Sequence, residues 1–103
     1  MKNTLVFLAA NVSLKPTEVR LLEKIDSLGL VPPGGNSGNS EYRENPFSGA
    51  KEFLTPLACA LHDFIIGAYR QGLVGKTVPV SIWDRARYLF LKLWPDAYYN
   101  LID

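Results

Sequence analysis

The sequence predicts a mostly α-helical protein with a single domain, 1–103, and three observations lead to that prediction. Apolar residues recur at helical spacing in three separate stretches, which are 16–28, 56–72 and 81–94. Each stretch begins with a proline or a serine, residues that suit the start of a helix. The chain has 103 residues, 48% of them apolar, which is enough for one modest core and too few for two.

The N-terminal third contains a short apolar run and then a helix. Residues 4–10 are apolar, but a run of this length fits a buried strand or a helical turn equally well. The stretch 16–28 is clearer, because Pro16 suits a first helical turn and Glu18 favours the positive end of the helix dipole. Leu21, Leu22 and Ile25 lie on one side of this helix and predict its buried face.

The middle of the chain is predicted to contain a loop and a small hairpin. Residues 32–41 are rich in glycine, asparagine and serine, which predicts a flexible loop. Residues 42–54 surround a turn with Asn-Pro and Ser-Gly dipeptides, which predicts a minor β-hairpin. An isolated hairpin is unstable in water, so we expect Phe47 and Phe53 to anchor this one on the rest of the domain.

The two longest helices, 56–72 and 81–94, are expected to pack as an antiparallel pair because the connection between them is short. Thr55 caps the first of these helices and Pro56 begins it. Ser81 is expected to cap the second, with Asp84 three residues further on.

Composition narrows the functional classes. The formal net charge is +1, so no strong overall field draws the protein to nucleic acid or to acidic lipid. Residues 56–94 are nevertheless locally basic, with five cations against two carboxylates. A single cysteine cannot form an internal disulfide, and no apolar run reaches the ~20 residues of a membrane helix. The sequence therefore predicts a cytoplasmic protein without membrane association.

The helix 81–94 carries the strongest candidate binding residues. Trp83, Arg87, Phe90 and Trp94 recur at helical spacing, and an arginine between aromatic rings can stack on a base or on a partner side chain. The same pattern also fits tryptophans that border the core, with the arginine extended over them. The predicted binding set is completed by three further residues, Arg85, Arg70 and Tyr88.

Catalytic and metal chemistry have weaker candidates. Cys59 and His62 are three residues apart on one helix, a spacing that permits a thiol–imidazole pair. No orienting group or oxyanion site accompanies them, and a lone cysteine in an apolar helix is usually a small buried side chain. One histidine and one cysteine are also too few for a closed metal site. We expect no catalytic residue, no metal and no cofactor.

A second surface is predicted on the outer side of the helix pair. Cys59, Ile66 and Tyr69 on one helix and Tyr88 and Leu91 on the next give that side an apolar character. Either the N-terminal third covers it or a second copy of the chain does, in a symmetric homo-oligomer.

Several short motifs resemble small uncharacterised proteins of bacteriophages and prophages. The likeness covers roughly residues 45–103, and its motifs are Asn45-Pro46-Phe47-Ser48-Gly49, Leu54-Thr55-Pro56-Leu57, Asp63-Phe64-Ile65, 84–90 and Pro95-Asp96-Ala97-Tyr98-Tyr99. The resemblance implies a setting rather than a mechanism. Small phage accessory proteins often inhibit host machinery, including CRISPR effectors, or sequester the nucleotide signals of host defence. No residue role is carried over.

Three functional hypotheses follow. The first is a non-enzymatic accessory protein that binds a host protein or a signalling nucleotide. The second is a nucleic-acid-binding module in which the helix 81–94 presents Arg85, Arg87 and Lys92. The third is a small enzyme that uses Cys59 and His62.

Overall fold

The computed structural model describes residues 4–30 and 40–102 and confirms a small, mostly α-helical domain. Its elements are α1 (Thr4–Leu8), α2 (Pro16–Ser27), β1 (Glu41–Glu44), β2 (Lys51–Leu54), α3 (Pro56–Arg70), α4 (Val80–Leu93), α5 (Pro95–Ala97) and the π-helical turn η1 (Tyr98–Ile102). Residues 4–10, left open between strand and helix, begin with a helix. The predicted loop 32–41 lies outside the described residues except for its last two, and Glu41 already belongs to β1.

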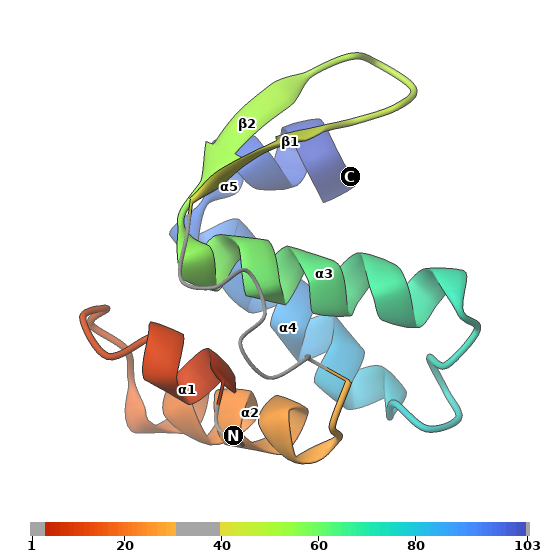
Figure 1. Ribbon diagram of the computed structural model, residues 1–103. Helices are drawn as coiled ribbons and strands as arrows, with labels where there is room; N and C mark the ends of the chain where they lie inside the picture. The colour runs from red at the N-terminus through yellow and green to blue at the C-terminus, as the bar shows by residue number, and fades with distance from the viewer. Residues whose placement is uncertain (1–3, 31–39, 103) are drawn as a thin grey trace.

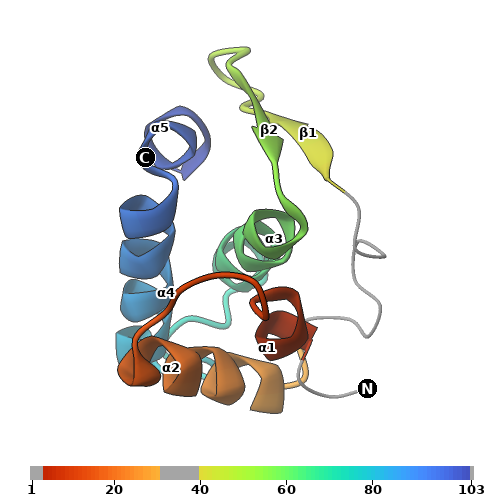
Figure 2. The same cartoon turned by 90° about the vertical axis from the view of Figure 1, so that its left-hand side faces the viewer.

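The helices and the hairpin lie at three levels (Figure 1). α1 and α2 lie at one end, α3 and α4 cross in the middle, and the hairpin β1–β2 lies beside α5 and η1 at the other end. α4 runs back in the general direction opposite to α3 and crosses it obliquely. A quarter turn shows α3 nearly end-on, surrounded by α1, α4 and the hairpin (Figure 2).

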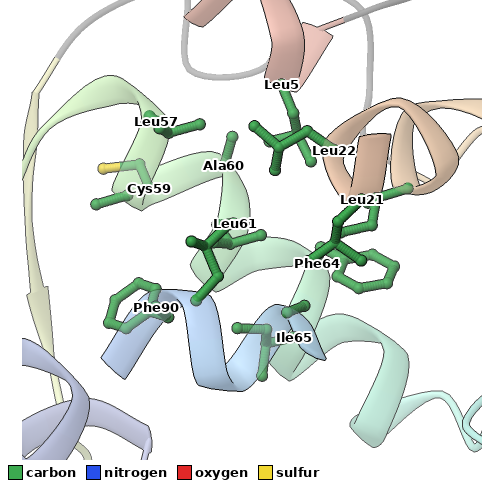
Figure 3. Packing of buried hydrophobic residues seen from close by; sticks show 14 of the residues in the cluster. Leu5, Leu21, Leu22, Leu57, Cys59, Ala60, Leu61, Phe64, Ile65 and Phe90 are labelled. Atoms are coloured by element: carbon green, nitrogen blue, oxygen red, sulfur yellow. The ribbon is translucent and has the colours of Figure 1, made fainter. Parts of the chain in front are cut away.

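The core is centred on α3. All five residues from Leu57 to Leu61 are buried, so the first half of this helix has no face toward solvent. Leu5 from α1, Leu21 and Leu22 from α2 and Phe90 from α4 surround it (Figure 3). Thr55 caps α3 as predicted, because its hydroxyl oxygen accepts a hydrogen bond from the Ala58 N–H at 3.3 Å.

A carboxylate from α2 fixes α1. One Asp26 oxygen accepts the Leu5 backbone N–H at 2.8 Å, and the other accepts the Val6 N–H at 3.2 Å. These N–H groups belong to the first turn of a five-residue helix and have no partner within it. Asp26 therefore caps a helix that lies about twenty positions earlier in the sequence.

The hairpin docks through polar side chains and through the buried Leu54 at the end of β2, and the expected anchors were wrong. Phe47 is 96% exposed and Phe53 is 60% exposed. In their place, Arg43 donates to Asp63 at 2.6 Å and to the His62 Nδ1 at 3.2 Å. The hairpin also reaches η1, because the Asn45 amide donates to the Asn100 carbonyl oxygen at 3.0 Å.

Strand register explains why Phe53 remains outside. Tyr42 pairs with Phe53 and Arg43 pairs with Glu52 in the antiparallel ladder. Successive side chains in a strand point to opposite faces, so placing Arg43 against α3 places Tyr42 and Phe53 on the outer face. Their rings pack on each other there, with centroids 4.7 Å apart.

The start of α4 also differs from the prediction. Ser81 does not cap it, because the helix begins at Val80 and Pro79 occupies the cap position without a side-chain hydrogen bond. Gly75 has a positive φ of 86° in the preceding turn, and its N–H donates to the Val78 carbonyl oxygen at 2.7 Å. The cap position of α4 therefore lies two residues earlier than the serine signal suggested.

Replacing Asp26 with alanine is expected to loosen α1. The change leaves the Leu5 and Val6 N–H groups without their acceptor and should lower the free energy of unfolding by about 1–2 kcal/mol. Urea denaturation measures this loss. Glu23→Ala is the matched control, because Glu23 is an exposed carboxylate on the same helix and makes no contact to α1 among the described residues. Equal stability of the two variants would contradict the capping role.

The only histidine should make stability depend on pH. Burial lowers the pKa of His62, and the neighbouring Arg43 guanidinium lowers it further. Because the folded pKa lies below the ordinary value of ~6.5, the unfolded chain takes up the proton first as the pH falls. The stabilisation is therefore present above pH ~6.5 and is lost as the pH falls below it.

Urea midpoints at pH 8 and pH 5.5 measure this effect. The wild type should lose stability at the lower pH, whereas His62→Asn, which keeps an acceptor for Arg43 and has no imidazole to titrate, should lose much less. Since the chain has one histidine, no other imidazole titrates in this window. The same loss in both proteins would rule out His62 as its source.

Candidate functional site

Four of the six predicted binding residues lie on two different flanks of α4. Trp83 and Arg87 face α3 and η1, where they hydrogen bond to Ile65 and Tyr98. Arg85 and Tyr88 face the opposite way, toward the beginning of α2. The structure therefore divides the predicted set into two groups with different surroundings.

The first group forms a row of stacked side chains, Tyr69, Trp83, Arg87 and Tyr98, which we call the aromatic–arginine row. The Tyr69 and Trp83 rings stack with centroids 6.0 Å apart and an interplanar angle of 19°. The Arg87 guanidinium carbon lies 4.8 Å from the centre of the Trp83 ring, a cation–π contact. Arg87 also donates to the Tyr98 hydroxyl oxygen at 2.9 Å.

This row links α4 to α3 and to η1. The Trp83 indole N–H donates to the Ile65 carbonyl oxygen at 2.9 Å, which ties α4 to α3. Arg87 ties α4 to η1 and also lies 3.5 Å from Asp84. Because the guanidinium already has a ring, a hydroxyl and a carboxylate as partners, a ligand would have to displace one of them.

The remaining members of the predicted stripe are placed away from this row or beneath it. Phe90 is fully buried and packs between His62 and Trp94, with the Trp94 ring edge-on at 5.0 Å. Trp94 is half-buried at the end of α4. Arg70, a predicted binding residue outside this stripe, is exposed at the end of α3. Burial and the charge of Arg43 are the larger causes that lower the pKa of His62, and the charge of Arg70 lowers it further.

The second group lines a groove between α2 and α4, which we call the α2–α4 groove. Its volume is about 260 Å³. The α4 side is one helical face, because its residues are spaced at i, i+3, i+4 and i+7. The lining residues are Lys15, Thr17, Glu18, Leu21, Arg85, Tyr88, Leu89 and Lys92.

The electrostatics of the groove favour an anion. Glu18 is its only carboxylate, and Lys92 donates to it at 2.6 Å. The Lys92 hydrogen bond and then the Lys15 backbone N–H hold the pKa of Glu18 below its usual range, so this carboxylate is ionised and already paired. Arg85 is exposed and has no ion pair among the described residues. The Tyr88 ring lies at the rim and is 73% exposed.

The candidate thiol and imidazole are both engaged in the fold. Cys59 is completely buried, with its Sγ 3.6 Å from the Leu54 carbonyl oxygen. The Nδ1 atom of His62 accepts a hydrogen bond from Arg43, which places the ring proton on Nε2. Within residues 4–30 and 40–102, no three histidine, cysteine or acidic side chains gather as metal ligands.

The predicted outer apolar surface needs correction. Cys59 does not contribute to it, because the end of β2 covers this cysteine. Ile66 and Leu91 are half-buried against the core. Tyr69 and Tyr88 are exposed as expected, but Tyr69 belongs to the aromatic–arginine row and Tyr88 to the α2–α4 groove. A homo-oligomer remains a prediction.

Sequence reasoning identified only the α4 half of the groove. Lys92 follows Arg85 by seven residues and Tyr88 by four, so their common face was readable from the spacing. Lys15, Thr17 and Glu18 were missed as site residues, because only the tertiary packing of α2 on α4 brings them there.

Comparisons with known proteins found no match among protein-family models, curated proteins or solved structures. Among the described residues, no helix is both long enough and apolar enough to cross a membrane.

The hydrogen bond between Arg87 and Tyr98 should be measurable by a double-mutant cycle. Arg87→Ala should lower the free energy of unfolding by about 1–2 kcal/mol, because it removes this bond and the cation–π contact. With Tyr98→Phe as the second change, the coupling should be about 0.5–1.5 kcal/mol. Urea denaturation of the four proteins measures it. Arg85→Ala should change stability by less than about 0.5 kcal/mol, and a comparable loss would contradict the division of the two flanks.

Proposed function

We propose that this protein is a non-enzymatic binding protein that holds an anionic ligand, a nucleotide signal, in the α2–α4 groove. The observation that carries the proposal is the convergence of three cations and one exposed ring on a groove whose only carboxylate is already paired. Arginine and lysine supply charge-assisted hydrogen bonds to phosphate, and a tyrosine ring supplies a stacking surface.

The groove fits binding better than chemistry. Its floor is made by Leu21 and Leu89, both nearly buried, and its rim by cationic and aromatic side chains. The cysteine and the histidine lie outside its lining, so neither the thiol nor the imidazole faces a ligand held there. Recognition without turnover is the function that this set of groups serves.

The resemblance to small phage proteins supplies the setting for the proposal. In that setting the ligand is a nucleotide signal of host defence, and the protein acts by sequestering it in the host cytoplasm. Inhibition of a host protein is the alternative within the same hypothesis. The hairpin favours it through the exposed pair Tyr42 and Phe53, since tyrosine and phenylalanine are typical interface residues.

A nucleic-acid-binding role is supported less well. It requires Arg85, Arg87 and Lys92 to reach one phosphate backbone together. Arg87 lies on the other flank of α4 and is engaged by Trp83 and Tyr98. Binding to a single-stranded oligonucleotide that weakens steeply with salt would nevertheless favour this alternative over the nucleotide.

The first experiment is native mass spectrometry of the freshly purified protein, followed by titration with adenine nucleotides by calorimetry. We expect Arg85→Ala and Tyr88→Ala each to weaken nucleotide binding about tenfold or more, because they remove the unpaired cation and the stacking ring.

Arg20→Ala is the matched control, because Arg20 is an exposed arginine on α2 that does not line the groove. It should bind as the wild type does. The proposal would fail if all three variants bound equally, or if the wild type neither carried nor bound a nucleotide.

A further inference from the structure

From the charge and size of the α2–α4 groove, we infer that its ligand is a mononucleotide with a terminal phosphomonoester rather than a cyclic or bridging phosphodiester. This inference rests on the proposed function and specifies the substrate class of the same site. Three features of the groove carry it, namely its charge, its size and the position of its one ring.

The charge of the groove matches a dianion. Lys15, Arg85 and Lys92 contribute three positive charges, and Glu18 contributes one negative charge. Glu18 is held ionised by its contact with Lys92, so the remaining charge is +2. A phosphomonoester carries between −1.5 and −2 at pH 7, whereas a phosphodiester carries one negative charge and leaves a cation of the groove without a counter-charge.

The unpaired cations lie where a phosphate can reach both α2 and α4. Arg85 projects from α4, and Lys15 immediately precedes the first residue of α2. Thr17 adds a hydroxyl donor from the first turn of α2. A terminal phosphate has three free oxygens for these donors, whereas a diester has two.

The size of the groove limits its ligand to a small molecule. Its volume of about 260 Å³ lies just below the ~300–1,000 Å³ of pockets that enclose drug-sized ligands. Tyr88 is the only aromatic residue among those that line it. One ring can stack one base, so a single mononucleotide uses all the groups of the groove and a dinucleotide leaves its second base without a partner.

The test compares adenosine 5′-monophosphate with adenosine 3′,5′-cyclic monophosphate by calorimetry at low salt and pH 7.5. The two share the base and the ribose and differ in the charge of the phosphate and in its ring closure to the 3′ oxygen. We expect the 5′-monophosphate to bind about tenfold more tightly, because its extra negative charge interacts with the exposed cations Lys15 and Arg85. Lys15→Ala should reduce this preference, whereas Lys24→Ala, an exposed lysine of α2 outside the groove, should retain it.

Repeating the comparison at pH 5 separates the effect of the phosphate charge from the effect of the nucleotide shape. The second phosphate pKa of a monoester is ~6, so at pH 5 the 5′-monophosphate becomes a monoanion and its preference should disappear. The cyclic nucleotide keeps its single charge and reports any effect of pH on the protein itself. Within the groove, the hydrogen bond from Lys92 lowers the pKa of Glu18 and so favours the ionised form of this carboxylate.

The outcomes distinguish this inference from the proposed function. Equal binding of the two nucleotides, or tighter binding of the cyclic one, overturns the inference and leaves a nucleotide-binding groove. A preference that persists unchanged at pH 5 also overturns it, because the extra charge would then not be its cause. Absence of binding by both nucleotides overturns the inference as well, and the ligand captured in native mass spectrometry then decides the proposed function.

Discussion

The burial of the first half of α3 on every side is the constraint on which the rest of the structure depends. Five consecutive residues, from Leu57 to Leu61, are buried, and a helix enclosed in this way needs neighbours around its whole circumference. In a chain of 103 residues, α1, α4 and the hairpin β1–β2 supply those neighbours. Each of these neighbouring elements is also held in place by a polar contact. Asp26 holds α1, Arg43 holds the hairpin, and Trp83 holds α4.

The same arrangement gives two arginines of α4 different roles. Arg85 and Arg87 are two residues apart, and on a helix this separation places them on clearly different sides. One side meets α3 and η1, so Arg87 finds a ring and a hydroxyl and becomes part of the fold. The other side meets the beginning of α2, where Glu18 is already paired with Lys92 and Arg85 is exposed with no ion pair among the described residues.

Local signals located the three longest helices, but they were insufficient for α1, for the cap of α4 and for the contacts between elements. Thr55 and Pro56 begin α3 as the sequence indicates, because a cap and a first-turn proline act within a few residues. The hairpin anchors could not be read in this way. Hydrophobicity pointed to Phe47 and Phe53, whereas Asn45 bonds to a carbonyl 55 residues later. The candidate site divides similarly. Arg85 and Tyr88 were among the predicted binding residues, while the contribution of Lys15 and Glu18 depends on a contact between residues 74 positions apart.

The burial of Cys59 has a practical consequence. The chain has one thiol, and it is completely enclosed at the junction of β2 and α3, with its sulfur beside the Leu54 carbonyl oxygen. A thiol reagent can therefore react only when this junction opens, so the rate of alkylation reports the opening of one defined place in the molecule. No label has to be introduced for such a measurement. The one cysteine of the sequence therefore serves as a probe of local opening at the point where the hairpin joins α3.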